Sequence, residues 1–185
     1  NCELIELRAE EKDGFTVPVE RFENFMHDVR PNAFVFSNPC NPTGQVIKDE
    51  AMDRYIDAAR KENCLLGADE FYATFSYNED GSPAEKAVSA LPYVKDINRD
   101  PVIVFDGLTK GFRYPGWRAG WAIGPKYLIE MINRAASAVD GGPSTMVQRG
   151  VIEELAEGHA EAELLATRKE FAVKRKMMME GLAEL

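Results

Sequence analysis

The chain has 185 residues, a net charge of −9 and an apolar fraction of 45%, values typical of a globular protein large enough to bury a core. The negative charge argues against binding to nucleic acid or to an anionic membrane surface. Its three cysteines are widely spaced and form neither a metal-ligand pattern nor a disulfide framework, which favours a reducing, cytoplasmic compartment. No apolar run is long enough to span a membrane, and no signal-peptide pattern occurs.

Short apolar runs bounded by turn residues predict five strands. The predicted strands cover residues 3–7, 33–37, 65–68, 102–105 and 119–123. The last is expected to be antiparallel, because the link before it is too short for a crossover helix.

Apolar residues at helical spacing predict five helices between and after these strands. The predicted helices cover residues 16–29, 49–63, 124–139, 144–158 and 159–185, with a further helical turn at 83–90. In the last helix an apolar residue recurs every seven positions, at Leu164, Phe171, Met178 and Leu185. The alternation of strands and helices predicts an α/β fold with three layers, in which helices flank a mostly parallel sheet. The chain begins in strand-like sequence and stops inside a helical pattern, so we expect it to be part of a longer protein.

An unusual polar loop follows each of the three buried strands. These loops are NPCNPTG at residues 38–44, DEFY at 69–72 and DGLTK at 106–110. If the strands are parallel, the loops meet at one edge of the sheet, where open α/β sheets bind their ligands. Arg118 follows the third loop, between two tryptophans.

Each of these side chains also has an ordinary structural interpretation. Lys110 is compatible with a solvated cation, and Arg118 with a stacked or ion-paired surface residue. The Asn41 side chain could hydrogen-bond the backbone of its own turn, and Asp69 could cap the next element. Tyr72 could be an aromatic residue of the core. His27 and His159 lie in polar helical contexts and receive no role.

Taken together, however, the side chains match one chemistry. A lysine amine condenses with an aldehyde, and a carboxylate keeps a pyridine nitrogen protonated. An amide and a phenol bind a ring hydroxyl, while a guanidinium and a hydroxyl bind a phosphate. These are the groups that a protein supplies around pyridoxal phosphate.

The motifs NPCNPTG, ADEFY and LTKGFRYPGWRAGW, in this order, resemble class I/II aminotransferases of the aspartate-aminotransferase fold. This resemblance implies that Lys110 forms the aldimine (Schiff base) with pyridoxal 5'-phosphate and carries protons between the substrate and the cofactor. It implies that Asn41 and Tyr72 contact the 3-hydroxyl and that Asp69 pairs with the ring nitrogen. Thr109 and Arg118 would bind the phosphate, and the Asn41–Pro42 bond is expected to be cis.

The chain departs from the family pattern in the third loop. Many members have Ser-x-Ser-Lys where this chain has Gly107-Leu108-Thr109-Lys110, so one phosphate-binding hydroxyl is missing. The family's glycine-rich phosphate loop, ring-stacking aromatic and carboxylate-binding arginine also find no match. The resemblance therefore implies that residues 1–158 are part of the cofactor-binding large domain, and that 159–185 form a helix leading to a small domain.

The expected function is transfer of an amino group from an amino acid to a 2-oxo acid by a longer, homodimeric protein, with this chain alone inactive. Two alternatives stay open. One is a pyridoxal-phosphate-dependent C–S lyase, synthase or decarboxylase, because the same residues serve those reactions. The other is a regulatory domain of aminotransferase type without catalysis.

Overall fold

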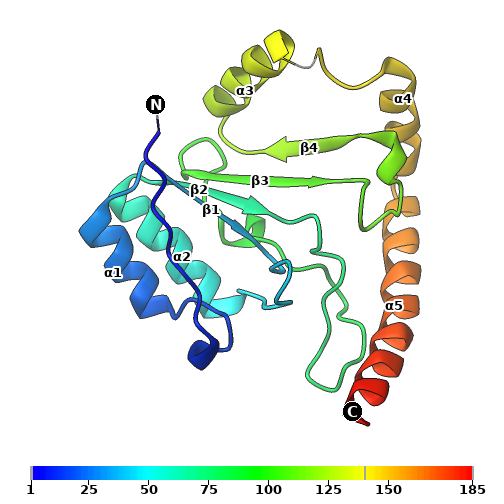
Figure 1. Cartoon of the computed structure of the whole chain (residues 1–185). Helices are drawn as coiled ribbons and strands as arrows, with labels where there is room; N and C mark the ends of the chain where they lie inside the picture. Colours follow the sequence, from blue (N-terminus) through cyan, green and yellow to red (C-terminus); the bar gives the residue numbers. More distant parts are fainter. Residues whose placement is uncertain (1, 140, 185) are drawn as a thin grey trace.

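The computed structural model describes residues 2–139 and 141–184, and its core is a four-stranded sheet (Figure 1). The strands are β1 (Ala33–Ser37), β2 (Leu65–Asp69), β3 (Val102–Gly107) and β4 (Gly120–Ile123). They lie in the order β1-β2-β3-β4, with β1, β2 and β3 parallel and β4 antiparallel to β3. The predicted α/β fold, its mostly parallel sheet and the antiparallel last strand are thus confirmed.

The described part of the chain has five helices. They are α1 (Val19–Val29), α2 (Asp49–Glu62), α3 (Lys126–Val139), α4 (Thr145–Glu154) and α5 (His159–Ala183). Three short 3-10 turns complete the regular structure: η1 (Glu11–Asp13), η2 (Leu91–Tyr93) and η3 (Pro115–Trp117). In the part of the chain that the structure describes, no helix is both long and apolar enough to cross a bilayer.

Helices α1 and α2 cover one face of the sheet and form the main core with it. The predicted stripe of α2, namely Met52, Tyr55, Ile56 and Ala59, is fully buried. The rings of Phe22 on α1 and Tyr55 on α2 stack with their centroids 3.8 Å apart. Removing such side chains from water is the main favourable term in folding, at about 1.5–3 kcal/mol for each large one.

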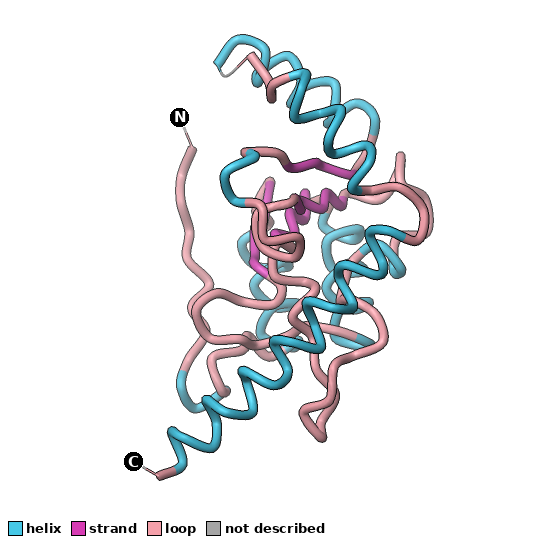
Figure 2. The backbone as a smooth tube through the Cα atoms, turned by 90° about the vertical axis from the view of Figure 1, so that its right-hand side faces the viewer, coloured by secondary structure: helices cyan, strands magenta, loops and turns pink. Residues whose placement is uncertain are grey.

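A second, smaller cluster attaches α4 and α5 to the loop after β3. Leu108 and Phe112 are buried there against Val151 of α4 and Leu164 of α5. Figure 2 shows α5 as one long helix that continues past the loops toward the C-terminal end. The main core and this second cluster therefore lie on different sides of the strand ends. The loops after the strands lie between the two clusters, and both clusters hold them in place.

Several predicted elements were wrong in detail. Residues 3–7 form no strand: the segment runs beside the sheet without pairing to it (Figure 1). Residues 83–90 are irregular, and the turn expected there lies later, at η2. In α5 the seven-residue repeat is only partly buried, because the helix extends beyond the body it packs on and leaves Met178 63% exposed. The repeat's last member, Leu185, lies outside the described residues.

Candidate active site

The loop after β1 is shaped by a buried amide. Asn38 is fully buried, and its side chain donates to the Ile47 carbonyl and accepts from the Ile47 N–H, both at 2.8 Å. These bonds close residues 38–47 into a fixed loop and leave Asn41 exposed on its outer side. The expected cis Asn41–Pro42 bond is present, and Asn38–Pro39 is cis as well.

The loop after β3 is anchored on both sides of Lys110. Leu108 and Phe112 are buried in the second cluster, and the Leu108 N–H donates to the Ala119 carbonyl at 3.1 Å. The Arg113 N–H donates to the Lys110 carbonyl at 3.1 Å and closes a tight turn. Lys110 itself is half-buried, so its position follows from its anchored neighbours.

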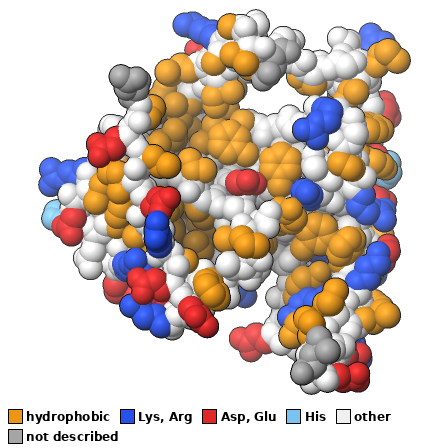
Figure 3. Space-filling view, viewed as in Figure 1, with side chains coloured by type: hydrophobic (Ala, Val, Ile, Leu, Met, Phe, Trp, Pro, Cys, Tyr) orange, Lys and Arg blue, Asp and Glu red, His pale blue; other side chains and the backbone are white. Residues whose placement is uncertain are grey.

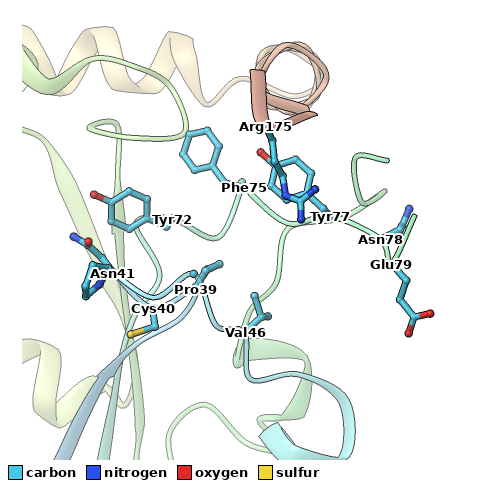
Figure 4. Close-up of a pocket in the computed structure, with 12 residues that line it drawn as sticks. Pro39, Cys40, Asn41, Val46, Tyr72, Phe75, Tyr77, Asn78, Glu79 and Arg175 are labelled. Atoms are coloured by element: carbon cyan, nitrogen blue, oxygen red, sulfur yellow. The ribbon is translucent and has the colours of Figure 1, made fainter. Parts of the chain in front are cut away.

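Two cavities adjoin at the carboxyl ends of the parallel strands. Asn41 lines one of about 520 Å³, and Thr109 and Lys110 line the other of about 500 Å³. Tyr72 lines both, together with Phe75 and Tyr77, so these three residues form an aromatic ridge between the cavities. Figure 4 shows Asn41 and Tyr72 next to each other at one end of the first cavity.

The Lys110 amine is directed at the ridge. Its Nζ lies over the Tyr72 ring, 5.2 Å from the ring centroid. This distance is within the range at which a cation is attracted to an aromatic face. Four of the six predicted site residues, Asn41, Tyr72, Thr109 and Lys110, therefore line these two adjoining cavities, which together with the ridge they share are called the cleft below.

The other two predicted residues do not line either cavity. Asp69 ends β2 half-buried, and its Oδ1 accepts a 3.2 Å hydrogen bond from the Phe71 N–H. Arg118 is exposed in the left-handed region at φ 51°, and it donates to the Pro115 carbonyl at 3.0 Å. In this structure Asp69 lies at the strand end below the cleft, while Arg118 is held by the turn before it.

Two further carboxyls lie at the ends of β2 and β3: Glu70, which is buried, and Asp106, which is half-buried. Burial raises the pKa of Glu70 to about 7 and that of Asp106 to about 6. The negative charge of Asp69 raises the pKa of Asp106 further, and Asp106 does the same to Glu70. The pKa values of Glu70 and Asp106 are thus raised by burial first and by a neighbouring carboxylate second.

The structure gives a reason for Gly107, where the family pattern has a serine. A Cβ atom at this position would lie 2.7 Å from the Ala119 carbonyl oxygen and 2.7 Å from the Gly120 Cα. Because β3 and β4 approach this closely, the position has no room for a side chain, and the hydroxyl expected from the pattern is excluded by packing.

Sequence reasoning assigned no role to several residues that line the cleft, among them Phe75, Arg113 and Arg175. Arg113 falls inside the motif around Lys110, so its position in the motif was an available signal. Arg175 lies on the distant helix α5, and only the tertiary structure brings it to the cleft.

Comparison with known proteins identifies the family. The family model for aminotransferase class I and II matches residues 1–185. The chain belongs to this family. Aspartate/prephenate aminotransferase from Thermus thermophilus is 27% identical over 184 residues, which cover 98% of the chain and 45% of that protein. Aspartate aminotransferase from Pyrococcus abyssi is 24% identical over 181 residues, covering 98% of the chain and 44% of that protein.

Solved structures of aminotransferases superpose well on the chain. A double mutant of Thermus thermophilus aspartate aminotransferase gives a TM-score of 0.82 at 26% identity, covering 97% of the chain and 44% of that structure. The aromatic aminotransferase from Pyrococcus horikoshii gives 0.80 at 25% identity, covering 95% of the chain and 45% of the structure. The chain therefore spans less than half the length of these relatives.

Proposed function

We propose that this chain is the cofactor-binding part of a pyridoxal-phosphate-dependent aminotransferase, which moves an amino group from an amino acid to a 2-oxo acid. One observation carries the proposal: the loops after three parallel strands bring Asn41, Tyr72 and Lys110 to one cleft. Membership of the aminotransferase family supports it.

The donor set around the cleft fits the cofactor. When bound, pyridoxal phosphate supplies an aldehyde and an electron-withdrawing ring. Lys110 would be the amine that holds the aldehyde, and Asn41 and Tyr72 would be the hydrogen-bonding partners of the ring hydroxyl. Asp69 would be the carboxylate for the ring nitrogen. The phosphate is left to the Thr109 hydroxyl and the Arg118 guanidinium, with Arg118 reorienting from its Pro115 contact.

We assign to Lys110 the transfer of a proton at the substrate α-carbon. A general base has to be within hydrogen-bond reach of the proton it removes. The anchors Leu108 and Phe112 limit the movement of its backbone, while its side chain stays free over the Tyr72 ring. Tyr72 covers one side of the amine and thereby limits the access of water.

The remaining parts of the proposal concern the whole protein. Residues 1–158 would belong to the large domain, and residues 159–185 would lead to a small domain that completes the substrate site. We expect the chain alone to be inactive and the complete protein to be a homodimer. The free cysteines Cys2, Cys40 and Cys64 fit a cytoplasmic location.

Covalent labelling tests the assignment. The complete protein is incubated with pyridoxal phosphate, reduced with borohydride and mapped by mass spectrometry. We expect the added mass on the peptide containing Lys110, and its loss in Lys110→Ala. Lys126→Ala, which removes an 84% exposed lysine outside the cleft, is the matched control and should leave the label in place. Labelling spread evenly over surface lysines would reject the proposal.

The reaction type is tested separately. Incubating the loaded protein with an amino acid alone should release a 2-oxo acid and leave the amino group on the cofactor. Release of free ammonia together with the 2-oxo acid would instead indicate lyase chemistry. The two results differ in whether ammonia is released, so an ammonia assay distinguishes them.

A further inference from the structure

The chain after β2 folds back on itself as a hairpin between residues 73 and 88. The Val88 N–H donates to the Ala73 carbonyl at 3.3 Å, and the Ala84 N–H donates to the Ser76 carbonyl at 3.0 Å. The outgoing limb of this hairpin carries two of the three residues of the aromatic ridge, and the third comes directly before it. The position of the ridge therefore depends on how the hairpin is held.

A buried arginine on α5 holds the returning limb of the hairpin. Arg168 is 7% exposed, and its Nη1 donates to the carbonyls of Ala84 at 3.0 Å and Glu85 at 2.9 Å. Its Nε is buried and finds no partner among the described residues, and burial lowers the pKa of its guanidinium. Because a buried charge is costly unless it is hydrogen-bonded, the two bonds to the hairpin favour this one position of the limb.

Two further residues on the same face of α5 contact the outgoing limb. The Phe171 ring lies 4.8 Å from the Phe75 ring, and the guanidinium carbon of Arg175 lies 5.2 Å from the centre of the Tyr77 ring. Figure 4 shows Arg175 of α5 next to Tyr77. With Arg168, these residues are spaced three and four positions apart, which places them on one side of the helix. One helix face thus holds both limbs.

The same helix also holds the loop that carries Lys110. Leu164 packs in the second cluster with the anchors of this loop. Arg113 pairs with Glu163 and with Glu170, the second pair at 3.6 Å. Helix α5 therefore contacts both the hairpin after β2 and the loop after β3, and it sets one relative to the other.

The hairpin, α5 and the Lys110 loop meet at Gly111, directly beside Lys110. A Cβ atom at Gly111 would lie 3.0 Å from Leu164 Cδ2 and 3.0 Å from Thr74 Oγ1. Thr74 is 6% exposed and follows Tyr72 by two positions. Since this junction has little room even for a methyl group, a shift of the hairpin would be felt at Tyr72 and at Lys110 together.

We infer that Arg168 is a positioning residue: by holding the hairpin on α5, it fixes the Tyr72 ring against the Lys110 amine. Arg168 lines neither cavity of the cleft, so it acts through Tyr72 and not by contact with a ligand. The inference rests on the proposed function for one point, that pyridoxal phosphate reacts with Lys110. The geometry of Tyr72 over Lys110 can also be measured without the cofactor.

Two rates measured at Lys110 of the complete protein test the inference. Acetylation by acetic anhydride, without cofactor, reports how well the Tyr72 ring covers the amine. Labelling by pyridoxal phosphate and borohydride reports how well the amine is oriented toward a bound aldehyde. In Arg168→Met we expect acetylation to become about fivefold faster, because the hairpin opens locally. We expect labelling to become about tenfold slower, because the reacting groups are no longer aligned.

Two variants make the test specific. Arg168→Lys keeps the charge and a donor for one carbonyl, so both rates should shift in the same directions but less. It decides the test by itself if Arg168→Met does not fold. Arg60→Met removes another largely buried arginine, which donates to the Tyr93 carbonyl at 2.9 Å and pairs with Asp100 away from the cleft. It should lower the melting temperature and change neither rate at Lys110.

Unchanged rates in the Arg168 variants would overturn the inference, and so would equal changes in Arg168→Met and Arg60→Met. In a protein that takes the label, a change in only one of the two rates would also overturn it. The proposed function fails in a different way. No label on Lys110 of the unaltered protein, with acetylation that depends on Arg168, would reject the cofactor assignment and keep the positioning role. A label on Lys110 with both rates independent of Arg168 would do the reverse.

Discussion

At the scale of single residues, Glu70 is a buried carboxyl that makes the stability of the fold depend on pH. It is 3% exposed, and its Oε1 accepts a 2.7 Å hydrogen bond from the Ala90 N–H. Burial raises its pKa from 4.5 to about 7, so the folded state holds this proton more tightly than the unfolded state does. A carboxyl with a raised pKa contributes stability below its unfolded pKa of 4.5, and that contribution is lost as the pH rises through about 7.

We therefore predict that Glu70→Gln removes part of the pH dependence of unfolding. The uncharged amide keeps an acceptor for Ala90, so the variant should gain stability relative to the unaltered chain as the pH rises from about 4.5 to about 8. Over this pH range, the free energy of unfolding of the variant relative to that of the unaltered chain should rise by about 3 kcal/mol. This estimate uses roughly 1.4 kcal/mol for each unit by which the pKa is raised. Urea unfolding at a series of pH values measures it. Glu157→Gln, an exposed carboxyl, is the control, and a Glu70→Gln profile parallel to that of the unaltered chain would contradict the prediction.

At the scale of elements, β3 and β4 approach each other most closely just before the Lys110 loop. Besides its two backbone neighbours, a Cβ at Gly107 would meet Phe71 Cε1 at 2.9 Å. Phe71 belongs to the loop after β2, so this point joins two of the three site loops. Overpacking here is expected to move the Lys110 loop as well as the strands.

We predict that Gly107→Ser, which restores the family pattern, destabilises the chain by about 2–3 kcal/mol and weakens cofactor labelling at Lys110. The added side chain would force β4 or Phe71 to move, and the new hydroxyl would not compensate. Urea unfolding and the labelling assay measure the two effects. Gly116→Ala is the control, because a Cβ there meets nothing within 4 Å. A Gly107→Ser variant as stable as Gly116→Ala, with tighter cofactor binding, would contradict the packing argument.

The same scale explains which elements could be predicted from sequence. Helix α2 and strands β2 and β3 carry buried residues at regular positions, so their periodicity is visible in the residues themselves. Strand β1, predicted as a buried strand, is only partly buried, because it is the edge strand with one neighbour among the described strands. Residues 3–7 alternate like a strand, but a strand exists only through hydrogen bonds to a neighbour, and this segment lies beside β1 without pairing to it. The turn at η2 depends on Pro92 and on packing against the core, which the polar sequence before it does not indicate.

At the scale of the whole molecule, the parallel order of three strands made the meeting of their loops predictable. Which segments distant in the sequence lie close together in space could not be predicted from the sequence. Arg175 reaches the cleft only because α5 passes the aromatic ridge, and Glu70 lies near Asp106 only because β2 pairs with β3. No local pattern marks either contact.

The sheet is also open at β1, with consequences for the molecule as a whole. Strand β1 has one neighbour, β2, among the described strands, and residues 2–8 lie beside it around a cavity of about 870 Å³ without pairing. Val35 in the middle of β1 is 71% exposed. Figure 3 shows apolar side chains gathered over the middle of one face of the molecule. An unpaired apolar edge strand is a site of association between chains.

We predict that the 185-residue chain self-associates through β1 and that Val35→Lys reduces this association. A lysine on an edge strand opposes pairing with a second strand, because its charge would have to be buried in the new interface. Sedimentation velocity over a tenfold range of concentration measures the effect as a lower mean sedimentation coefficient at high concentration. Val173→Lys, on a 61% exposed residue of α5, is the matched control and should leave the association unchanged. If both variants reduced association equally, general charge repulsion would explain the result, and β1 would not be the associating edge.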